Sequence, residues 1–151
     1  MTATIRIQAE PFDPAAETAL LTGGRADIGA VAAFTGFCRD EGGRLSALEL
    51  EHYPGMAEVE ITRIAAEAET RWPLLGLTII HRFGKIPPGD QIVLVLAAST
   101  HRRAAFEAAE FLMDYLKTRA PFWKREHLKD GTVGAWVEAK EVDDEAAERW
   151  G

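Results

Sequence analysis

Seven consecutive apolar residues at positions 92–98 (IVLVLAA) constrain the fold of this chain more than any other feature. A PPGD turn sequence precedes the run and potential helix caps follow it at positions 99 and 100, which predicts a strand over residues 91–99. Successive side chains of a strand point to opposite faces, so a run that is apolar on both faces belongs in the centre of a sheet. The run is far shorter than the roughly 20 apolar residues that span a bilayer, so we predict no membrane segment.

Periodicity and turn residues divide the rest of the chain into further strands and helices. We predict strands over residues 4–8, 26–39, 45–53 and 75–83, and helices over residues 14–21, 56–72 and 101–119. A DEGGR turn joins the second and third strands into a predicted hairpin. A KDG turn joins residues 122–127 and 132–139 into a predicted closing pair of strands, before a short acidic helix over residues 143–150. Because hairpins outnumber βαβ crossovers, we predict an α+β fold with a largely antiparallel sheet and two principal helices.

The composition predicts a single globular domain over residues 1–151, because the chain has no internal repeats, low-complexity tracts or Pro/Ser-rich linker. Its 17 Lys and Arg residues against 24 Asp and Glu residues give a net charge of -7, which argues against nucleic acid bound through bulk charge. One cysteine excludes an intrachain disulfide and a CxxC pair. The N-terminus lacks the basic and apolar regions of a signal peptide, so we expect a cytoplasmic protein.

Sequence motifs for the common cofactor and metal sites are missing. The chain contains no GxxxxGK[ST], GxGxxG or HExxH motif, and no two of its four histidines stand at the spacing of metal ligands. We therefore predict no metal site, no P-loop and no dinucleotide-binding fold.

Three basic residues, His101, Arg102 and Arg103, begin the predicted third helix. Cations are unfavourable at this end of a helix dipole unless an anion compensates them. Free backbone N–H groups together with these side chains would form a phosphate or carboxylate site. The alternative is that the cations are solvated or paired with acidic residues elsewhere, and the sequence leaves both interpretations open.

A dense group of ionisable residues surrounds a Pro-Phe-Trp sequence at the other end of this helix: Lys117, Arg119, Lys124, Arg125, Glu126 and His127. Mutual repulsion and partial burial beside the aromatic rings would lower the pKa of a lysine towards the range in which it acts as a base or nucleophile. Cations that complement the C-terminal end of a helix dipole are the alternative. That alternative accounts for Lys117 and Arg119, but poorly for Lys124, which lies beyond the proline.

Cys38 and Arg39 end the predicted second strand. Arg39 would lower the pKa of a neighbouring thiol. Alternation, however, places Cys38 on the face of Phe34 and Gly36, where a lone cysteine is more often a small core residue. Arg39 lies on the opposite face, either directed into a pocket or solvated beside the turn.

The length of the third helix separates its two basic ends. His101 and Lys117 are 16 residues apart, which is about 24 Å at 1.5 Å per residue. They cannot serve one small pocket within a single chain. Either there are two sites, or a twofold homodimer places the start of one helix beside the end of its partner's. We predict the homodimer, with two composite sites.

Four segments together resemble one known family: LEHYPGM (50–56), HRFGKIPPGD (81–90), STHR (99–102) and FLMDYLKTRAPFWKRE (111–126). The family is the large, catalytic subunit of molybdopterin synthase, and the likeness runs from about residue 27 to residue 150. The resemblance implies an α/β-hammerhead type of fold, which is compatible with the α+β prediction. It also implies a sulfurtransferase that needs no metal or organic cofactor.

The partners and the substrate also follow from the resemblance. In the family, the large subunit forms a central homodimer with a small ubiquitin-like subunit at each end, which makes a heterotetramer. The Gly-Gly tail of the small subunit carries a C-terminal thiocarboxylate into the pocket of the large subunit. Its sulfur is transferred, twice, to cyclic pyranopterin monophosphate, which gives the dithiolene of molybdopterin.

The resemblance implies site residues as well. Lys117 and Lys124 match the two essential lysines of the family. The positions that bind the pterin and its phosphate match Arg39, His101 and Arg102, of which the last two come from the second large subunit. The implied substrate-binding set is completed by Phe37, Cys38, Arg125 and Glu126. Related sequences often carry a polar or basic residue in place of Phe37, which argues against a role for its side chain and leaves one for its backbone.

Two closely spaced lysines can supply the acid and the base that the exchange of oxygen for sulfur requires. We expect Lys117 to contact the thiocarboxylate or acyl carbonyl, and Lys124 to act as acid and base on the pterin. Because the sulfur arrives on the partner, Cys38 is not needed as a sulfur carrier. The alternatives are an inactive dimeric scaffold that binds anions and an enzyme whose own Cys38 carries the sulfur; nucleic-acid binding is the weakest.

Overall fold

The computed structural model describes residues 3–40, 42–118, 121–137, 147–148 and 150. The strands within these ranges are β1 (Thr4–Gln8), β2 (Ala30–Phe37), β3 (Leu45–His52), β4 (Leu74–Arg82), β5 (Gly84–Ile86), β6 (Gln91–Ser99) and β7 (Phe122–Leu128). The helices are α1 (Pro14–Thr22), α2 (Met56–Arg71) and α3 (Arg102–Thr118). These elements confirm the predicted α+β fold, in which α2 and α3 are the two principal helices.

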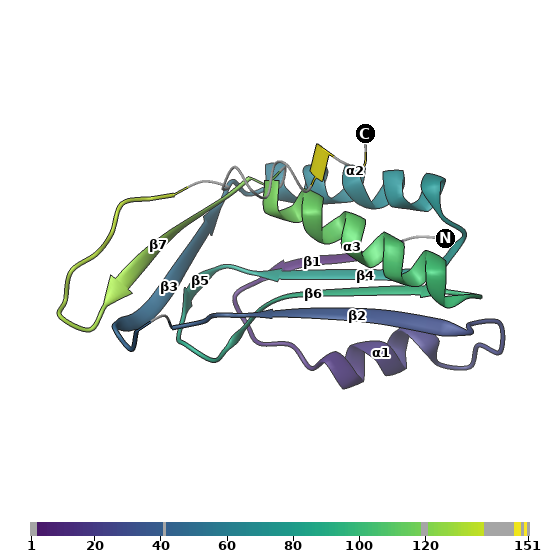
Figure 1. Cartoon of the computed structure of the whole chain (residues 1–151), viewed down its shortest axis with the longest axis horizontal. Helices are drawn as coiled ribbons and strands as arrows, with labels where there is room; N and C mark the ends of the chain where they lie inside the picture. The colour runs from purple at the N-terminus through teal and green to yellow at the C-terminus, as the bar shows by residue number, and fades with distance from the viewer. Residues whose placement is uncertain (1–2, 41, 119–120, 138–146, 149, 151) are drawn as a thin grey trace.

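The strands form two sheets (Figure 1). The larger sheet has the order β1-β4-β6-β2, with a parallel β1–β4 pair and two antiparallel pairs. Helices α2 and α3 cover one face of this sheet, and α1 lies against the other. The smaller sheet has the order β5-β3-β7, is antiparallel, and extends from one end of the larger sheet. The predicted dominance of antiparallel pairing is therefore confirmed.

Strand β6 lies between β4 and β2, as its apolar run predicts. Val93, Val95 and Ala97 belong to the core that includes residues of α2 and α3, whereas the alternate residues Leu94 and Leu96 belong to the core on the opposite face. Burying an aliphatic side chain of this size stabilises a fold by roughly 1.5–3 kcal/mol. The central strand thus joins the two layers of helices through one continuous sheet.

Capping and apolar stripes place the two long helices over this sheet. Helix α2 begins after Gly55, whose φ of 88° favours glycine, and the Gly55 N–H donates a hydrogen bond of 2.6 Å to the Glu58 carboxylate. Helix α3 buries a stripe that includes Ala105, Ala108 and Leu112. The last turn of α3 consequently lies where the larger sheet meets the smaller one (Figure 1).

The predicted hairpin between residues 26–39 and 45–53 is wrong. Strand β2 pairs with β6, and β3 pairs with β5 and β7, so the two strands lie in different sheets. The pairing of β2 is irregular between Gly36 and Phe37. Beyond that point, the Cys38 N–H donates to the Asp90 carbonyl and the Cys38 carbonyl accepts from the Gly89 N–H. The chain is thereby held beside the turn before β6 and crosses to the smaller sheet.

Other boundaries also differ from the predicted ones. The second strand begins at Ala30, and the three-residue strand β5 is too short to show a periodicity. Residues 132–137 make only isolated bridges to the outer edge of β7, Lys124 with Val137 and His127 with Val133, and do not form the predicted strand. The end of that predicted strand and most of the predicted last helix fall at residues 138–146 and 149, outside the described residues. No helix in the described ranges is long and apolar enough to cross a bilayer.

Candidate active site

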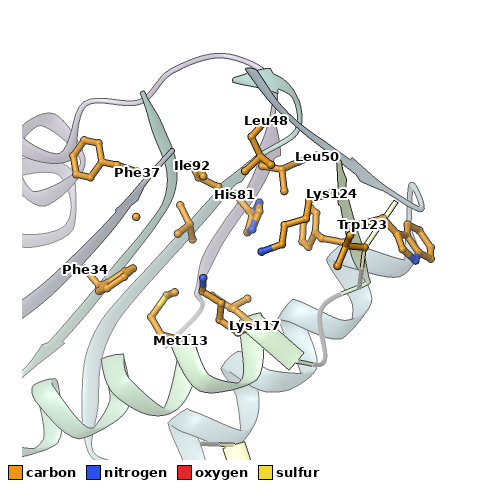
Figure 2. A pocket seen from close by; sticks show the side chains of 15 residues that line it. Phe34, Phe37, Leu48, Leu50, His81, Ile92, Met113, Lys117, Trp123 and Lys124 are labelled. Carbon is orange, nitrogen blue, oxygen red and sulfur yellow. The ribbon is translucent and has the colours of Figure 1, made fainter. Parts of the chain in front are cut away.

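A pocket lies where the last turn of α3 meets both sheets. Most of the side chains that line it are apolar: Phe34, Phe37, Leu48, Leu50, Ile92, Val93, Met113, Leu116, Phe122, Trp123 and Val137. Its ionisable lining consists of His81, Lys117 and Lys124 (Figure 2), with no carboxylate among the described residues. Nowhere in the described part of the chain do three His, Cys, Asp or Glu side chains gather as a metal site requires.

Lys117 and Lys124 reach this pocket from different elements. Lys117 lies in the last turn of α3, and Lys124 lies in β7 opposite Leu50 of β3. Figure 2 shows both amino groups directed into the same space. Charge interactions are stronger between apolar walls than in water. The structure therefore brings the two predicted lysines together in a place where they would stabilise an anion.

His81 lines the same pocket near the end of β4. Its ring stacks on that of Phe122, with the centroids 3.8 Å apart and the planes 15° from parallel. Its Nδ1 lies 2.9 Å from the carbonyl oxygen of Arg82. Burial lowers the pKa of His81 to about 4, and the positive charge of Lys117 contributes to this lowering. His81 is therefore neutral at physiological pH.

His81 is not among the predicted site residues, because in the sequence it stands alone, with no second histidine at the spacing of metal ligands and no cluster of charged neighbours. The alternation of side chains along β4 is a signal in the sequence that points to His81. Leu77 and Ile79 face the core beneath α2 and α3, and His81 follows them on the same face. A histidine on an apolar face that leads towards the end of α3 is a candidate for the pocket.

Arg125 points away from the pocket. Strand pairing places it opposite Glu49, and its Nε donates a hydrogen bond of 2.9 Å to Glu49 Oε1. Its guanidinium lies 4.2 Å from the centroid of the Trp136 ring. His127 Nε2 lies 2.7 Å from the same carboxylate oxygen. Hydrogen bonds from His127 and Arg125 hold the pKa of Glu49 below its ordinary value, so Arg125 belongs to an ion-pair cluster on the other face of the smaller sheet.

Three more predicted site residues lie at the edge of the pocket or outside it. Phe37 lines the pocket and is 56% exposed. Glu126, opposite Leu48, is exposed beyond the lining residues. Cys38 is 2% exposed in a small core, and burial raises the pKa of its thiol. A buried, protonated thiol matches the structural interpretation of Cys38 rather than that of a sulfur carrier.

The predicted phosphate-binding residues lie apart from the lysines. His101 and Arg102 are exposed at the start of α3, and Arg39 is exposed just beyond β2. None of the three lines the pocket. Helix α3 is continuous from Arg102 to Thr118, which separates its two ends by the distance that the sequence predicts. One chain thus holds two separate cationic regions.

Comparison with known proteins gives relatives of one kind. The family described as MoaE protein matches residues 7–119. A molybdopterin synthase catalytic subunit from Mesorhizobium japonicum is 73% identical over 147 residues, which cover 97% of this chain and 92% of that protein. The structure of a molybdopterin biosynthesis MoaE protein from Burkholderia ambifaria is 51% identical, with a TM-score of 0.86 and coverage of 99% of both chains. Molybdopterin synthase from Staphylococcus aureus is 31% identical, with a TM-score of 0.78 over 87% of this chain and 94% of its own.

These likenesses cover more than the four segments on which the resemblance rests. The family match alone includes most of the described fold, and the relative from Mesorhizobium japonicum extends the likeness over nearly the whole chain. The resemblance inferred from the sequence is thereby confirmed. This chain belongs to the MoaE family of molybdopterin synthase catalytic subunits.

Proposed function

We propose that this chain transfers sulfur from a protein thiocarboxylate to cyclic pyranopterin monophosphate in the pocket of Lys117 and Lys124. The observation that carries the proposal is the pairing of two amines between apolar walls, with no carboxylate among the described lining residues. Two amines that converge between apolar walls attract an anion such as a thiocarboxylate more strongly than they would in water.

The sulfur donor is proposed to be the Gly-Gly tail of a small ubiquitin-like subunit. A tail without side chains can enter a narrow space in an extended conformation. The walls that would pack against it are apolar, with Phe34 and Phe37 from β2 and Leu48 and Leu50 from β3. The proposed assembly is a homodimer of this chain with one small subunit at each end, acting in the cytoplasm.

The two lysines are proposed to divide the chemistry between them. Lys117 binds the thiocarboxylate or its acyl oxygen, which holds the sulfur towards the pterin. Lys124 protonates the oxygen that departs from the pterin as the thiocarboxylate sulfur bonds to the pterin carbon, and it then takes a proton from the water that cleaves the acyl–sulfur bond. After water replaces the transferred sulfur, the tail of the small subunit ends as an ordinary carboxylate.

The phosphate of the substrate is proposed to bind at the start of α3 from a second copy of this chain. Free N–H groups at the beginning of a helix favour a phosphate, and the side chains of His101 and Arg102 add further hydrogen-bond donors there. Helix length prevents these residues from reaching the lysines of their own chain. A twofold dimer therefore completes each site, with Arg39 as a further phosphate contact.

A single-turnover assay tests the role of Lys124. The chain is mixed with thiocarboxylated small subunit and cyclic pyranopterin monophosphate, and the dithiolene product is measured. Lys124→Ala should abolish product while small-subunit binding stays nearly intact. Lys129→Ala, in an exposed turn outside the pocket, is the matched control and should behave as wild type. Near-normal product from Lys124→Ala would refute the assigned role.

A second arm tests the source of the sulfur. A small subunit that ends in an ordinary carboxylate should give no product with the wild-type chain. Product formation in that arm would require another sulfur donor, and a persulfide on Cys38 would then be sought by intact mass.

A further inference from the structure

His81 lies in the pocket but has no part in the roles proposed above. Its Nδ1 lies 2.9 Å from the Arg82 carbonyl oxygen. A carbonyl oxygen only accepts hydrogen bonds, so Nδ1 carries the proton of the neutral ring. Nε2 is then an unprotonated acceptor. It has no hydrogen-bond partner in the described part of the chain.

Packing holds the His81 ring in one orientation. Phe122 stacks on the ring at 3.8 Å. The Arg82 carbonyl that accepts the Nδ1–H hydrogen bond is itself held in place. The buried Arg82 side chain donates hydrogen bonds to the Ala9 carbonyl at 3.0 Å and to the Gln91 carbonyl at 2.9 Å. The ring and the amino ends of both lysines line the same pocket (Figure 2). The acceptor nitrogen is therefore preorganised within the pocket.

Burial, together with the positive charge nearby, keeps His81 neutral. Lys117 approaches from α3, Lys124 from β7 and His52 from β3. The strand neighbours Ile7 of β1 and Val93 of β6 are apolar. No described carboxylate lines the pocket. Burial is the main cause that lowers the pKa of His81 to about 4, and Lys117 and His52 contribute to the lowering, so the ring does not add a charge to that of the lysines.

We propose that His81 is a positioning residue whose Nε2 accepts a hydrogen bond from the Lys117 ammonium when the thiocarboxylate is bound, and so holds the ammonium against that anion. The inference rests on the proposed function of this pocket. A neutral acceptor orients an ammonium group without cancelling its charge. A carboxylate in the same place would bind the ammonium more strongly but would compete with the anionic sulfur donor.

Two variants separate this role from simple packing. His81→Phe keeps an aromatic ring to stack on Phe122 but removes the acceptor, whereas His81→Gln carries an amide oxygen that reaches the position of Nε2. Single-turnover transfer should fall roughly 10- to 100-fold in His81→Phe, the range expected for a lost hydrogen bond to a charged group. His81→Gln should recover most of the rate. Small-subunit binding should stay near the wild-type value in both.

The pH dependence of the same reaction supplies a second readout. In His81→Phe the ammonium form of Lys117 loses a hydrogen bond, so the alkaline limb of the pH–rate profile should move to lower pH. In His81→Gln the limb should return towards its wild-type position. A purely structural role predicts a lower Tm in both variants and no movement of this limb.

Nitrogen-15 NMR of the wild-type chain tests the acceptor even if a variant fails to fold. The His81 ring should be the neutral Nδ1–H tautomer down to about pH 5, as its pKa of about 4 requires. The Nε2–H tautomer would overturn the inference.

The outcomes distinguish the inference from the proposed function. An active wild type, an inactive Lys117→Ala and a fully active His81→Phe would overturn the role of His81 alone. So would equal losses in His81→Phe and His81→Gln with an unmoved pH profile. A wild type that transfers no sulfur, or an unchanged Lys117→Ala, would overturn the proposed function and the inference with it.

Discussion

The two ends of α3 carry basic residues in different surroundings. At its start, His101 and Arg102 are exposed and line no pocket with the lysines. At its end, Lys117 is also exposed but lines a pocket with apolar walls, together with the half-buried Lys124 and the buried, neutral His81. A charge acts weakly in water and strongly between apolar walls. Under the proposed function, the pocket at the end of α3 supplies the groups that handle sulfur, and the start of α3 from a second copy supplies the phosphate contacts.

Of the substitutions at the two ends of α3, removal of Lys117 should have the larger effect, because Lys117 is proposed to bind the reacting thiocarboxylate. Lys117→Ala is expected to lower single-turnover sulfur transfer roughly 10²- to 10³-fold, as for loss of a preorganised charge donor. Lys85→Ala, exposed in β5 and outside the pocket, is the control. A loss smaller than about tenfold would place the reacting charge elsewhere.

A substitution at the exposed start of α3 should have a smaller effect, which is limited to the affinity for the substrate. Arg102→Ala is expected to weaken cyclic pyranopterin monophosphate binding roughly 10- to 100-fold, because a charge-assisted contact to phosphate is lost. Small-subunit affinity should not change. Arg103→Ala provides a matched control one position further along the helix. Equal losses in both variants would indicate general electrostatic attraction instead of a defined contact.

The buried His81 should make the folded chain less stable in acid. Its pKa is about 4 in the folded chain and about 6.5 when unfolded, so the unfolded state binds more protons between these values. Its contribution to stability is therefore complete above about pH 6.5 and is lost as the pH falls towards 4. The free energy of unfolding should fall by about 2 kcal/mol through this group between pH 7 and 5. In urea titrations at the two pH values, His81→Phe should show a smaller fall, and an equal fall would contradict the assignment.

Cys38→Ser should have the smallest effect on sulfur transfer, since Cys38 lies in a separate small core. Transfer is expected to stay near the wild-type rate. The free energy of unfolding should fall by about 1 kcal/mol, because a hydroxyl is buried in place of the thiol. Loss of transfer in a folded Cys38→Ser chain would return Cys38 to the list of sulfur carriers.

Local sequence patterns predict the parts of this fold that depend on neighbours in the chain. The apolar run of β6 predicts a central strand, and the stripe of α3 predicts its buried face. The same patterns do not specify which strands pair. Glu49 and Arg125 are 76 residues apart and lie opposite one another in β3 and β7. For that reason the predicted hairpin of the second and third strands failed.

The candidate site shows the same limit. The length of α3 correctly separates His101 from Lys117, because helix rise is a local property. Lys117 and Lys124 are close in sequence and are separated by the turn at Pro121, so local sequence brings them near one another. His81 joins their pocket from β4, which is distant in sequence, so its position depends on the tertiary fold. Successive side chains of a strand point to opposite faces, so strand geometry predicts that Arg125 lies on the face of β7 opposite to Lys124. The resemblance alone places both residues in one site and does not predict this separation.

Complementation between two inactive chains tests most directly the claim that opposite ends of α3 from two copies form one site. A His101→Ala chain and a Lys117→Ala chain, with different affinity tags, are assembled into mixed dimers and supplied with thiocarboxylated small subunit and cyclic pyranopterin monophosphate. One site of each mixed dimer then has both His101 and Lys117 intact, so product should form at about half the wild-type level. Stable mixed dimers as inactive as their two parents would contradict the composite site.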